Sequence, residues 1–357
     1  MKNAEICIVT TRNIFDAPCL EKYRSIIKAP YDIIYWDRCN IEEECGAQNY
    51  YRFDGSLAPD ASKVAKLLLY VKFFKYVKNV LKNKEYKKLI VFPTQMGWII
   101  NRELKTKYKG KYLFDIRDYA GENNKIIKKL TSSAVNNAEL CSITSDAYKT
   151  FLPERDYIIS HNVQPIDNEL ISSYRNRVRE AGPIALSFIG SVRFIEQQEK
   201  IIRLFGNDER FVLKFIGRGS EQLETFCKQG NYKNVELIGR FERNQLGGFY
   251  SETDMAINIY GNKNPYLDYA LSNKLYSAAM MGMPILVSPD TYMAEISERY
   301  GFGIAVDTDD EAAPDKVYDF FNSINVDEML SGCDKFLESV EADEKSYTTA
   351  VENFLAQ

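Results

Sequence analysis

The sequence predicts an α/β protein with two domains, each built around a parallel β-sheet. Three observations support this class. With 357 residues, the chain exceeds the length that one hydrophobic core usually serves. Short apolar segments alternate with helical segments along both halves, which is typical of strand-helix-strand units. In the second half, glycines directly follow several apolar segments, as they do at strand-to-helix turns.

Composition and cysteine usage narrow the class of protein. Hydrophobic residues make up 45% of the chain and charged residues 27%, as in ordinary globular proteins. No apolar segment reaches the ~18 residues that span a bilayer, and the N-terminus lacks a signal-peptide core. The seven cysteines are scattered without a C-x-x-C pair, which indicates reduced thiols in a cytoplasmic protein. Because His161 is the only histidine, a histidine-based zinc site or a Ser-His-Asp triad would depend on it alone.

The first half opens with a buried strand at 5–10, a polar loop, a helix at 18–28 and a second strand at 31–36. The polar, aromatic-rich segment 39–60 has no periodicity and is expected to be irregular. Further strands are expected at 88–92, 112–116, 140–143 and 157–159.

Polar residues follow two of these strands directly. Arg12 and Asn13 follow the first strand, and Arg117 and Asp118 follow the strand at 112–116. Open α/β sheets bind ligands at the carboxyl ends of their strands, so these residues are candidate ligand contacts. For Arg117 and Asp118, a surface ion pair is an equal alternative.

A lysine-rich helix lies between the two strand groups of the first half. Residues 61–90 contain nine lysines and one glutamate, a local charge of +8 in a chain whose net charge is -4. The first half of this helix is aliphatic on one face, and further on that face carries Lys72, Lys75, Lys78 and Lys82. Either these lysines form a solvated outer face, or they contact an anionic membrane surface. A nucleic-acid role is not indicated, because the chain as a whole is acidic.

The second half repeats the alternation more clearly. Strands are expected at 184–189, 211–216, 235–238, 255–259, 284–287 and 303–306, with helices between them. The segment 164–183, bracketed by two prolines, is expected to link the domains, with room for a helix inside. His161 lies just before it and, as a catalytic base, lacks an orienting carboxylate nearby in the sequence.

Anion-binding features gather at the ends of the second-half strands. Three strands are followed by turns that pair a glycine with an arginine; these turns are Gly190–Arg193, Gly217–Ser220 and Gly239–Phe241. Backbone N–H groups at such glycines approach a phosphate closely. Lys274 lies in the first turn of a helix that Ser272 or Asn273 can cap, where a cation is unfavourable unless an anion compensates it. Together these features predict a phosphate site, although Lys274 could also point into water.

Five motifs in this half resemble, in order and spacing, the donor domain of GT-B glycosyltransferases, above all retaining family-four enzymes of bacterial capsule and surface polysaccharides. They are F-I-G-S-V-R, K-F-I-G-R-G, V-E-L-I-G-R-F, L-S-N-K-L-Y and G-M-P-I-L-V-S, and they cover roughly residues 184–306. The resemblance implies two Rossmann-like domains facing a cleft. It implies an acceptor-side domain at 1–163, a linker at 164–183, a donor domain at 184–335 and a C-terminal helix, 336–357, that returns to the first domain.

The resemblance also implies a reaction and roles for residues. The enzyme would move a hexose from a nucleotide sugar, such as a UDP- or GDP-sugar, to a polysaccharide or lipid-linked acceptor, with retention and without a metal or other cofactor. Independently of the resemblance, the lysines of residues 63–88 are expected to hold such an enzyme at the inner membrane face. The catalytic set would be Arg193 and Lys274, on the diphosphate, with Asp118; acceptor-side contacts would be Arg12, Asn13 and Arg117. The donor contacts would be Gly190, Ser191, Arg218, Gly219, Arg240, Phe241, Asn273, Ser277, Thr291 and Tyr292.

Two departures from the family pattern keep alternatives open. The family often has two glutamates eight positions apart, and here Tyr269 and Ser277 stand in their places, with Asp268 one residue away. A serine binds a ribose hydroxyl more weakly than a carboxylate does. A non-catalytic scaffold of capsule assembly is therefore one alternative. A nucleotide-sugar epimerase or hydrolase on the same fold is another, although it would need an acid-base set in the cleft.

Overall fold

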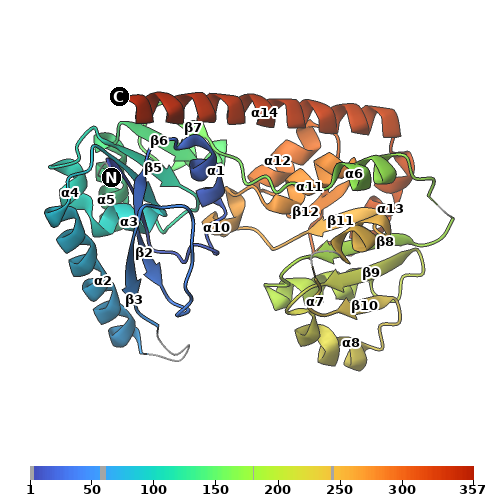
Figure 1. Cartoon of the computed structure of the whole chain (residues 1–357). Helices are drawn as coiled ribbons and strands as arrows, with labels where there is room; N and C mark the ends of the chain where they lie inside the picture. The colour runs from blue at the N-terminus through green and yellow to red at the C-terminus, as the bar shows by residue number, and fades with distance from the viewer. Residues whose placement is uncertain (1–3, 57–61, 180, 243–244) are drawn as a thin grey trace. The chain divides into compact units, whose positions relative to one another are not determined.

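The structure is a computed structural model that describes residues 4–56, 62–179, 181–242 and 245–357 (Figure 1). The chain forms two compact units. The first domain comprises Met1–His161 and Ala342–Gln357, and the second domain comprises Asn162–Glu341. Among the described helices, none combines the length and apolarity that crossing a bilayer requires.

The first domain is built on a seven-stranded parallel sheet with strand order β3-β2-β1-β4-β5-β6-β7 (Figure 1). Its central strands are buried on both faces, which explains their continuous apolar sequence. The strands are β1 (Ile6–Thr10), β2 (Tyr31–Asp37), β3 (Asn49–Asp54), β4 (Lys88–Phe92), β5 (Tyr112–Ile116), β6 (Leu140–Ile143) and β7 (Ile158–Ile159).

Helices cover both faces of this sheet. On one face, α1 (Cys19–Ile26) and the last part of α14 (Val326–Ala356) share a core with β1, β2 and β4. On the other face, α2 (Lys63–Asn83) packs on Trp36, and α3 (Thr94–Ile99) packs on Phe114. The remaining helices of this domain are α4 (Asn101–Lys105), α5 (Lys125–Asn137) and the 3-10 helix η1 (Asp146–Thr150).

The segment 39–60 was predicted to be irregular, and this prediction is wrong for residues 49–54, while residues 57–60 lie outside the described residues. Residues Asn49–Asp54 form the edge strand β3, which pairs in parallel with β2. Its sequence, N-Y-Y-R-F-D, does not alternate, because the strand is half-buried along its length rather than on one face. Phe53 packs edge-on against Trp36, with ring centroids 5.6 Å apart.

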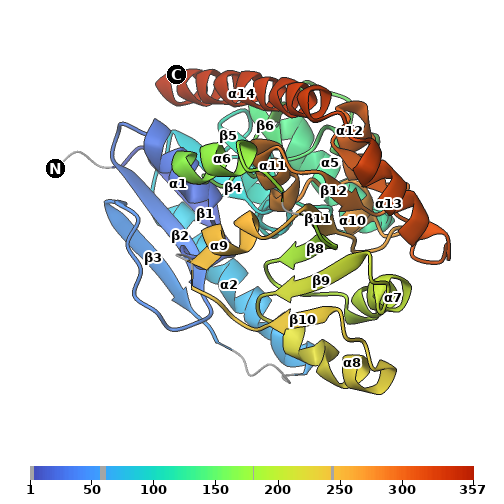
Figure 2. The same cartoon turned by 90° about the vertical axis from the view of Figure 1, so that its right-hand side faces the viewer.

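The second domain is built on a six-stranded parallel sheet with strand order β10-β9-β8-β11-β12-β13 (Figure 2). All six strands were predicted within one or two residues. They are β8 (Ile184–Ile189), β9 (Phe211–Ile216), β10 (Val235–Ile238), β11 (Met255–Asn258), β12 (Ile285–Val287) and β13 (Gly303–Ala305). The prediction of an α/β protein with two parallel-sheet domains is confirmed.

Alternate side chains of these strands enter two separate cores. On one face, Ile189 and Ile285 pack with α11 (Asn273–Met281) and α12 (Tyr292–Arg299). On the other face, Phe188 and Phe215 pack with α7 (Ile195–Phe205) and α13 (Ala313–Ser323). The shorter elements are η2 (Ser220–Leu223), α8 (Glu224–Gly230), α9 (Leu246–Ser251) and α10 (Pro265–Asp268).

The segment 164–183, expected as a linker, contributes to the second domain. It contains α6 (Asn168–Arg175), which begins after the capping side chain of Asp167. The buried Tyr174 hydroxyl donates a hydrogen bond to the Thr253 carbonyl at 2.8 Å. Arg175 donates to the carbonyl oxygens of Ala279 and Met280. These contacts attach the segment to the second domain.

Helix α14 begins in the second domain and ends in the first. Its first part contributes Phe336 and Val340 to a core of the second domain, and its last part contributes Val351 and Phe354 to a core of the first. The helix begins at residue 326, ten residues before the segment 336–357 that was expected to return to the first domain.

Candidate functional site

The carboxyl edge of the second sheet carries two loops whose backbones touch. Gly190 follows β8 with a φ of 127°, and Gly217 follows β9 with a φ of 133°. A Cβ atom on Gly217 would lie 2.0 Å from the Gly190 carbonyl oxygen, so only glycine fits there. The Gly190 N–H donates to the Ile216 carbonyl at 2.8 Å, and the Val192 N–H donates to the Arg218 carbonyl at 2.9 Å.

Lys274 reaches this pair of loops from the first turn of α11. Its Nζ lies 3.8 Å from the position that a Cβ atom on Gly190 would occupy. Nζ donates a hydrogen bond to the Tyr260 hydroxyl at 2.6 Å and lies 4.1 Å from the centroid of the Phe188 ring. The side chain of Lys274 therefore lies beside the glycine turn and does not point into water.

The surroundings of Lys274 disfavour its charge. Burial, and to a lesser degree the positive charge of Arg193, lowers the pKa of Lys274 to about 7. Burial also raises the pKa of Tyr260 to about 12, so the hydroxyl stays protonated and supplies no negative charge. An anion bound here would restore the charge of Lys274, as expected of a phosphate site.

The helix start at Lys274 is not capped as predicted. Ser272 is the N-cap residue of α11, but no side chain caps the first turn. Instead the Ser272 hydroxyl donates to the Asn258 amide oxygen at 2.9 Å. Asn273, the first residue of the helix, is half-buried. The Leu275 N–H donates to the Ser272 carbonyl at 3.1 Å, and the other N–H groups of the first turn suit an anionic ligand.

The arginines of the three turns lie along the same edge of the sheet. Arg193, Arg218 and Arg240 are exposed at the ends of β8, β9 and β10. Of these three arginines, Arg193 is the one whose charge contributes to the lowered pKa of Lys274. Arg240 follows the edge strand β10, two strands away from β8. The structure thus brings Arg193 and Lys274 together and sets Arg240 apart.

The remaining predicted donor contacts are spread around this edge. Ser191 is half-buried, and Gly219 has a φ of 103°; a Cβ atom on Gly219 would lie 2.4 Å from the Val192 carbonyl oxygen. Phe241 packs edge-on against Phe249, with ring centroids 5.3 Å apart, and Tyr292 packs against the α11 core.

Two further predicted contacts are engaged in the fold. Thr291 is the N-cap of α12: its hydroxyl accepts from the Ala294 N–H at 3.2 Å and donates to the Ser288 carbonyl. Ser277 is buried, and its hydroxyl lies near the Tyr250 hydroxyl. Beside Thr291 lies a pocket of about 80 Å³, far smaller than a nucleotide sugar needs. It is lined by Asn258, Tyr260, Gly261, Leu267, Ala270, Ser272, Ser288, Thr291 and Met293.

Sequence reasoning missed two aromatic residues around Lys274, and it named a third residue, Asp268, only as lying next to an expected acidic position. Phe188, buried in β8, and the half-buried Tyr260, two residues after β11, lie beside the Lys274 ammonium, but aromatic residues in or next to apolar strands normally indicate core. Asp268 at the end of α10 has a buried Oδ1 atom without a hydrogen-bond partner among the described residues. Burial raises the pKa of Asp268. In the sequence, Asp268 lies next to Tyr269, at which the family often has a glutamate. This proximity is the signal that the sequence offered.

The first domain brings together Arg12 and Asp118 at the carboxyl ends of β1 and β5. The Arg12 guanidinium lies 3.5 Å from the Asp118 carboxylate, and both side chains are exposed. Arg117 points inward and pairs with the fully buried Asp115 at 3.0 Å. For Arg117 the structure thus favours the ion-pair alternative, with a buried partner.

Asn13 is held within the first domain. Its amide nitrogen donates to Asp37 at 2.8 Å and to Glu43 at 2.9 Å, and its amide oxygen accepts from the Arg38 N–H. These contacts fix the loop after β1. They leave Arg12 and Asp118 as the predicted residues of this domain whose charged groups face solvent.

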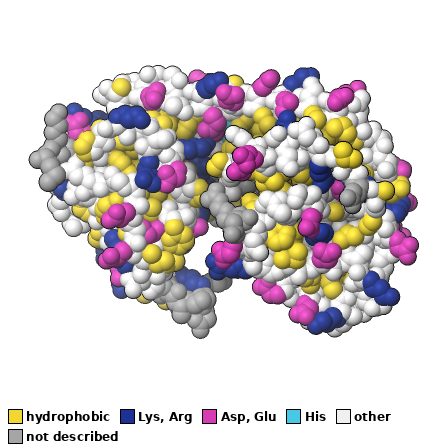
Figure 3. Space-filling model, turned by 45° about the vertical axis from the view of Figure 1, so that its right-hand side comes forward, with side chains coloured by type: hydrophobic (Ala, Val, Ile, Leu, Met, Phe, Trp, Pro, Cys, Tyr) yellow, Lys and Arg dark blue, Asp and Glu magenta, His cyan; other side chains and the backbone are white. Residues whose placement is uncertain are grey.

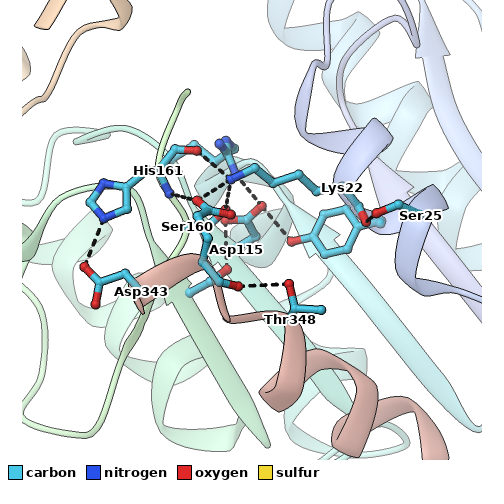
Figure 4. Close-up of polar contacts among 11 residues, drawn as sticks. Lys22, Ser25, Asp115, Ser160, His161, Asp343 and Thr348 are labelled. Atoms are coloured by element: carbon cyan, nitrogen blue, oxygen red, sulfur yellow. Dashed lines mark hydrogen bonds and ion pairs between the residues drawn. The ribbon is translucent and has the colours of Figure 1, made fainter. Parts of the chain in front are cut away.

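His161 belongs to a polar cluster to which helix α14 contributes Asp343 and Glu344 (Figure 4). Its Nε2 lies 3.0 Å from the Asp343 carboxylate, and its backbone N–H donates to Glu344 at 2.7 Å. Lys22 also pairs with Glu344, at 2.6 Å. Burial lowers the pKa of His161 although Asp343 opposes this shift. The orienting carboxylate that the sequence around His161 lacked therefore comes from α14.

Sequence comparison found no relatives: no model of a protein family matches the chain, and no curated protein matches it. Solved structures do match it. Sucrose-phosphate synthase from Thermosynechococcus elongatus aligns with a TM-score of 0.71 at 12% identity, over 99% of this chain and 100% of that chain. HepE from Anabaena, solved in complex with UDP, aligns with a TM-score of 0.66 at 10% identity, over 98% and 100%. WaaG, a glycosyltransferase involved in lipopolysaccharide biosynthesis, aligns with a TM-score of 0.61 at 11% identity, over 98% of each chain.

These matches cover both domains and extend over nearly the whole of each neighbour. At such low identity they establish the fold, whereas the activity has to be argued from the site. The chain has the GT-B fold, with two Rossmann-like, parallel-sheet domains.

Proposed function

We propose that the protein is a glycosyltransferase that moves a sugar from a nucleotide-sugar donor to a glycan acceptor. The observation that carries the proposal is the position of Lys274, whose ammonium lies beside the Gly190 turn and near Arg193. Two cations at a glycine turn, with no carboxylate bonded to Lys274 in the part of the chain that the structure describes, suit the diphosphate of such a donor. The neighbour that was solved with UDP has the same fold.

The proposed chemistry places negative charge where the cations are. As the bond between the sugar and the diphosphate breaks, its electron pair stays on the diphosphate oxygen, and a nucleoside diphosphate leaves. Arg193 and Lys274 stabilise that charge, so the reaction needs no metal ion from this site. A hydroxyl of the acceptor forms the new bond to the anomeric carbon and passes its proton to the departing diphosphate. We propose that the anomeric configuration is retained and that the sugar is a hexose.

For the acceptor we propose a surface polysaccharide or its lipid-linked precursor, as found in capsules. WaaG, which shares the fold, takes part in lipopolysaccharide biosynthesis. Arg12 and Asp118 lie at the carboxyl edge of the first sheet, which suits an acceptor hydroxyl. In this proposal Asp118 is the carboxylate that the first domain offers to the transfer chemistry.

A thermal-shift screen with UDP, GDP, ADP and CMP tests the donor assignment. A ligand that binds only the native state raises the melting temperature. We expect one nucleoside diphosphate to raise it and the matching nucleotide sugars to serve as donors in a transfer assay. If no nucleotide raises it, the proposal fails and a non-catalytic scaffold is the better explanation, since buried Ser277 lies near Tyr250 where family enzymes offer a carboxylate.

A further inference from the structure

Helix α2 packs against the sheet through its inner face alone, and the residues of its outer face are not needed for this packing. Phe73, Val77 and Leu81 are buried, and Phe73 packs on Trp36 with ring centroids 4.9 Å apart. Phe53 adds a third ring to this cluster. The inner face therefore holds the helix against the sheet and leaves the outer face free for another role.

The outer face of the first two turns is aliphatic. Four side chains there are strongly exposed: Val64 by 67%, Leu67 by 64%, Leu68 by 58% and Val71 by 41%. In an α-helix, positions spaced by three, four and seven residues share one face, so these four side chains form one patch. We call them the aliphatic patch. Clustered apolar exposure of this kind usually marks an interaction surface.

The same outer face becomes cationic in the later turns. Lys72, Lys75 and Lys82 are exposed, and α2 contains no acidic residue. On the face of the molecule shown in Figure 3, basic and acidic side chains are mixed. Lys78, which was predicted to belong to the same group, is directed elsewhere: its Nζ pairs with Glu103 at 3.2 Å. The cationic set is therefore Lys72, Lys75 and Lys82.

We propose that the outer face of α2 docks on an anionic lipid bilayer, with the aliphatic patch inserted among the acyl chains and the three lysines on the lipid phosphates. The aliphatic patch accounts for attraction to the acyl chains, which lysines alone do not supply. The lysines account for the choice of an anionic surface, which an aliphatic patch alone does not supply. A second copy of this chain fits less well, because two copies would bring their lysines together.

This inference is independent of the proposed function. It rests on exposure and charge along one helix and needs neither a donor nor a transfer reaction. If both hold, the enzyme works at the membrane face where a lipid-linked acceptor is found. If glycosyl transfer is disproved, membrane docking can still be measured, and the reverse is also true.

Flotation of the whole protein with vesicles tests the proposal. One set of vesicles contains phosphatidylcholine only, and the other contains phosphatidylcholine with phosphatidylglycerol. We expect the protein to float with the anionic vesicles and to remain at the bottom with the neutral ones. Replacing Lys72, Lys75 and Lys82 by Gln should weaken binding about 100-fold, since each lysine near an anionic surface contributes roughly tenfold or less.

A second variant, in which Val64, Leu67, Leu68 and Val71 are replaced by Ser, tests the aliphatic patch. The affinity of this variant for anionic vesicles should also fall at least tenfold. Added salt should weaken its remaining binding more completely than it weakens that of the wild type. Circular dichroism and melting temperature check that each variant is folded. Because the four side chains are exposed, the fold should be preserved.

Matched controls come from α5 of the same domain. Lys125, Lys128 and Lys129 are three exposed lysines whose change to Gln alters the net charge equally. Ile126 is 72% exposed, and its change to Ser removes an exposed aliphatic side chain elsewhere. Both controls should float like the wild type. Absence of flotation with anionic vesicles would overturn the proposal, as would equal losses in the controls or self-association in solution that depends on the aliphatic patch.

Discussion

Lys274 combines two environments that rarely occur together. Its ammonium lies against the ring faces of Phe188 and Tyr260, which attract a cation, yet burial and Arg193 destabilise its charge. The aromatic rings hold the side chain in place without neutralising it. The charge thus remains available to an anion that enters from the glycine turn.

Replacing Lys274 by Met should remove anion binding and keep the packing, since Met has a similar length and an apolar body. We expect the affinity for the nucleoside diphosphate found in the thermal-shift screen to fall at least 100-fold, as a charge-assisted contact is lost. Isothermal titration calorimetry measures the change. Lys233→Met is the control, because Lys233 is exposed and precedes β10. It therefore lies at the amino ends of the strands, whereas the site lies at their carboxyl ends. Unchanged affinity in Lys274→Met would refute the phosphate-site assignment.

The pKa of Lys274, lowered to about 7, predicts a pH dependence of donor binding. A bound diphosphate favours the protonated amine, so binding takes up a proton above pH 7 and the affinity falls as pH rises. Between pH 7 and pH 9 the expected loss is at most about 100-fold, since one proton gives tenfold for each pH unit. Calorimetry in buffers of different ionisation enthalpy detects the proton uptake.

The matched variant for this prediction is Lys274→Arg. A guanidinium stays charged throughout this range, so the variant should bind without proton uptake and with a flat pH profile. A wild-type profile that is equally flat would show that Lys274 does not titrate on binding.

At the residue level, the sequence was informative where a side chain conflicted with its local structure. Lys274 drew attention because a cation is unfavourable in the first turn of a helix. The Tyr260 contact and the pairing of His161 with Asp343 were not predictable, because each joins residues through tertiary structure. Asp343 is separated from His161 by 182 residues, and the periodicity of α14 does not indicate which residues face it.

At the scale of elements, the two crossing loops after β8 and β9 define the site. Gly217 is tightly constrained: a Cβ atom there would overlap the Gly190 carbonyl oxygen, and its φ of 133° is unfavourable for other residues. A Cβ atom on Gly239, in the corresponding turn after β10, would meet no described atom within 4 Å, and Gly239 has no positive φ. The two glycines thus differ although their sequence contexts are alike.

Gly217→Ala should therefore destabilise the second domain by about 2 kcal/mol from backbone conformation alone, with a further cost from the overlap with Gly190. Donor binding should be lost with it, since the Gly190 turn must move. Gly239→Ala should change the free energy of unfolding by less than about 0.5 kcal/mol. Urea unfolding followed by circular dichroism compares the two. Equal stability of the variants would show that the loops do not touch in solution.

Strand positions were predictable because central parallel strands are buried on both faces and leave largely apolar segments, as in β1 and β4. The edge strand β3 was missed because it is half-buried and has the sequence of a polar aromatic segment. Helix α6 lies in the segment that was expected to link the domains. Its attachment to the second domain was not predicted, because this attachment depends on contacts of Tyr174 and Arg175. Local patterns do not show such tertiary contacts.

At the scale of the whole molecule, the first domain is assembled from two separate parts of the chain. Residues 342–357 supply Tyr347, Val351 and Phe354 to its core, and Asp343 and Glu344 to the cluster around Lys22 and His161. The segment is therefore a structural part of this domain rather than an appendage.

Phe354→Ala should reduce the unfolding free energy of the first domain by about 3 kcal/mol, because it leaves a cavity in a packed core. The ammonium of Lys88, 4.6 Å from the Phe354 ring centroid, would also lose its aromatic partner. Glu352→Ala changes an exposed residue on the same helix and should shift the unfolding free energy by less than about 0.5 kcal/mol. Amide hydrogen exchange in β1 and β4 reports on this domain; unchanged exchange in Phe354→Ala would contradict the packing described.

The divided first domain has a consequence for the order in which the chain folds during synthesis. The ribosome releases residues 162–341 before it releases Ala342–Gln357, so the second domain, which is continuous in sequence, can complete its core first. Until the last helix emerges, α1 and the face of the sheet beside it lack the apolar partners Tyr347, Val351 and Phe354. The nascent first domain thus carries an uncovered hydrophobic surface throughout the translation of the second.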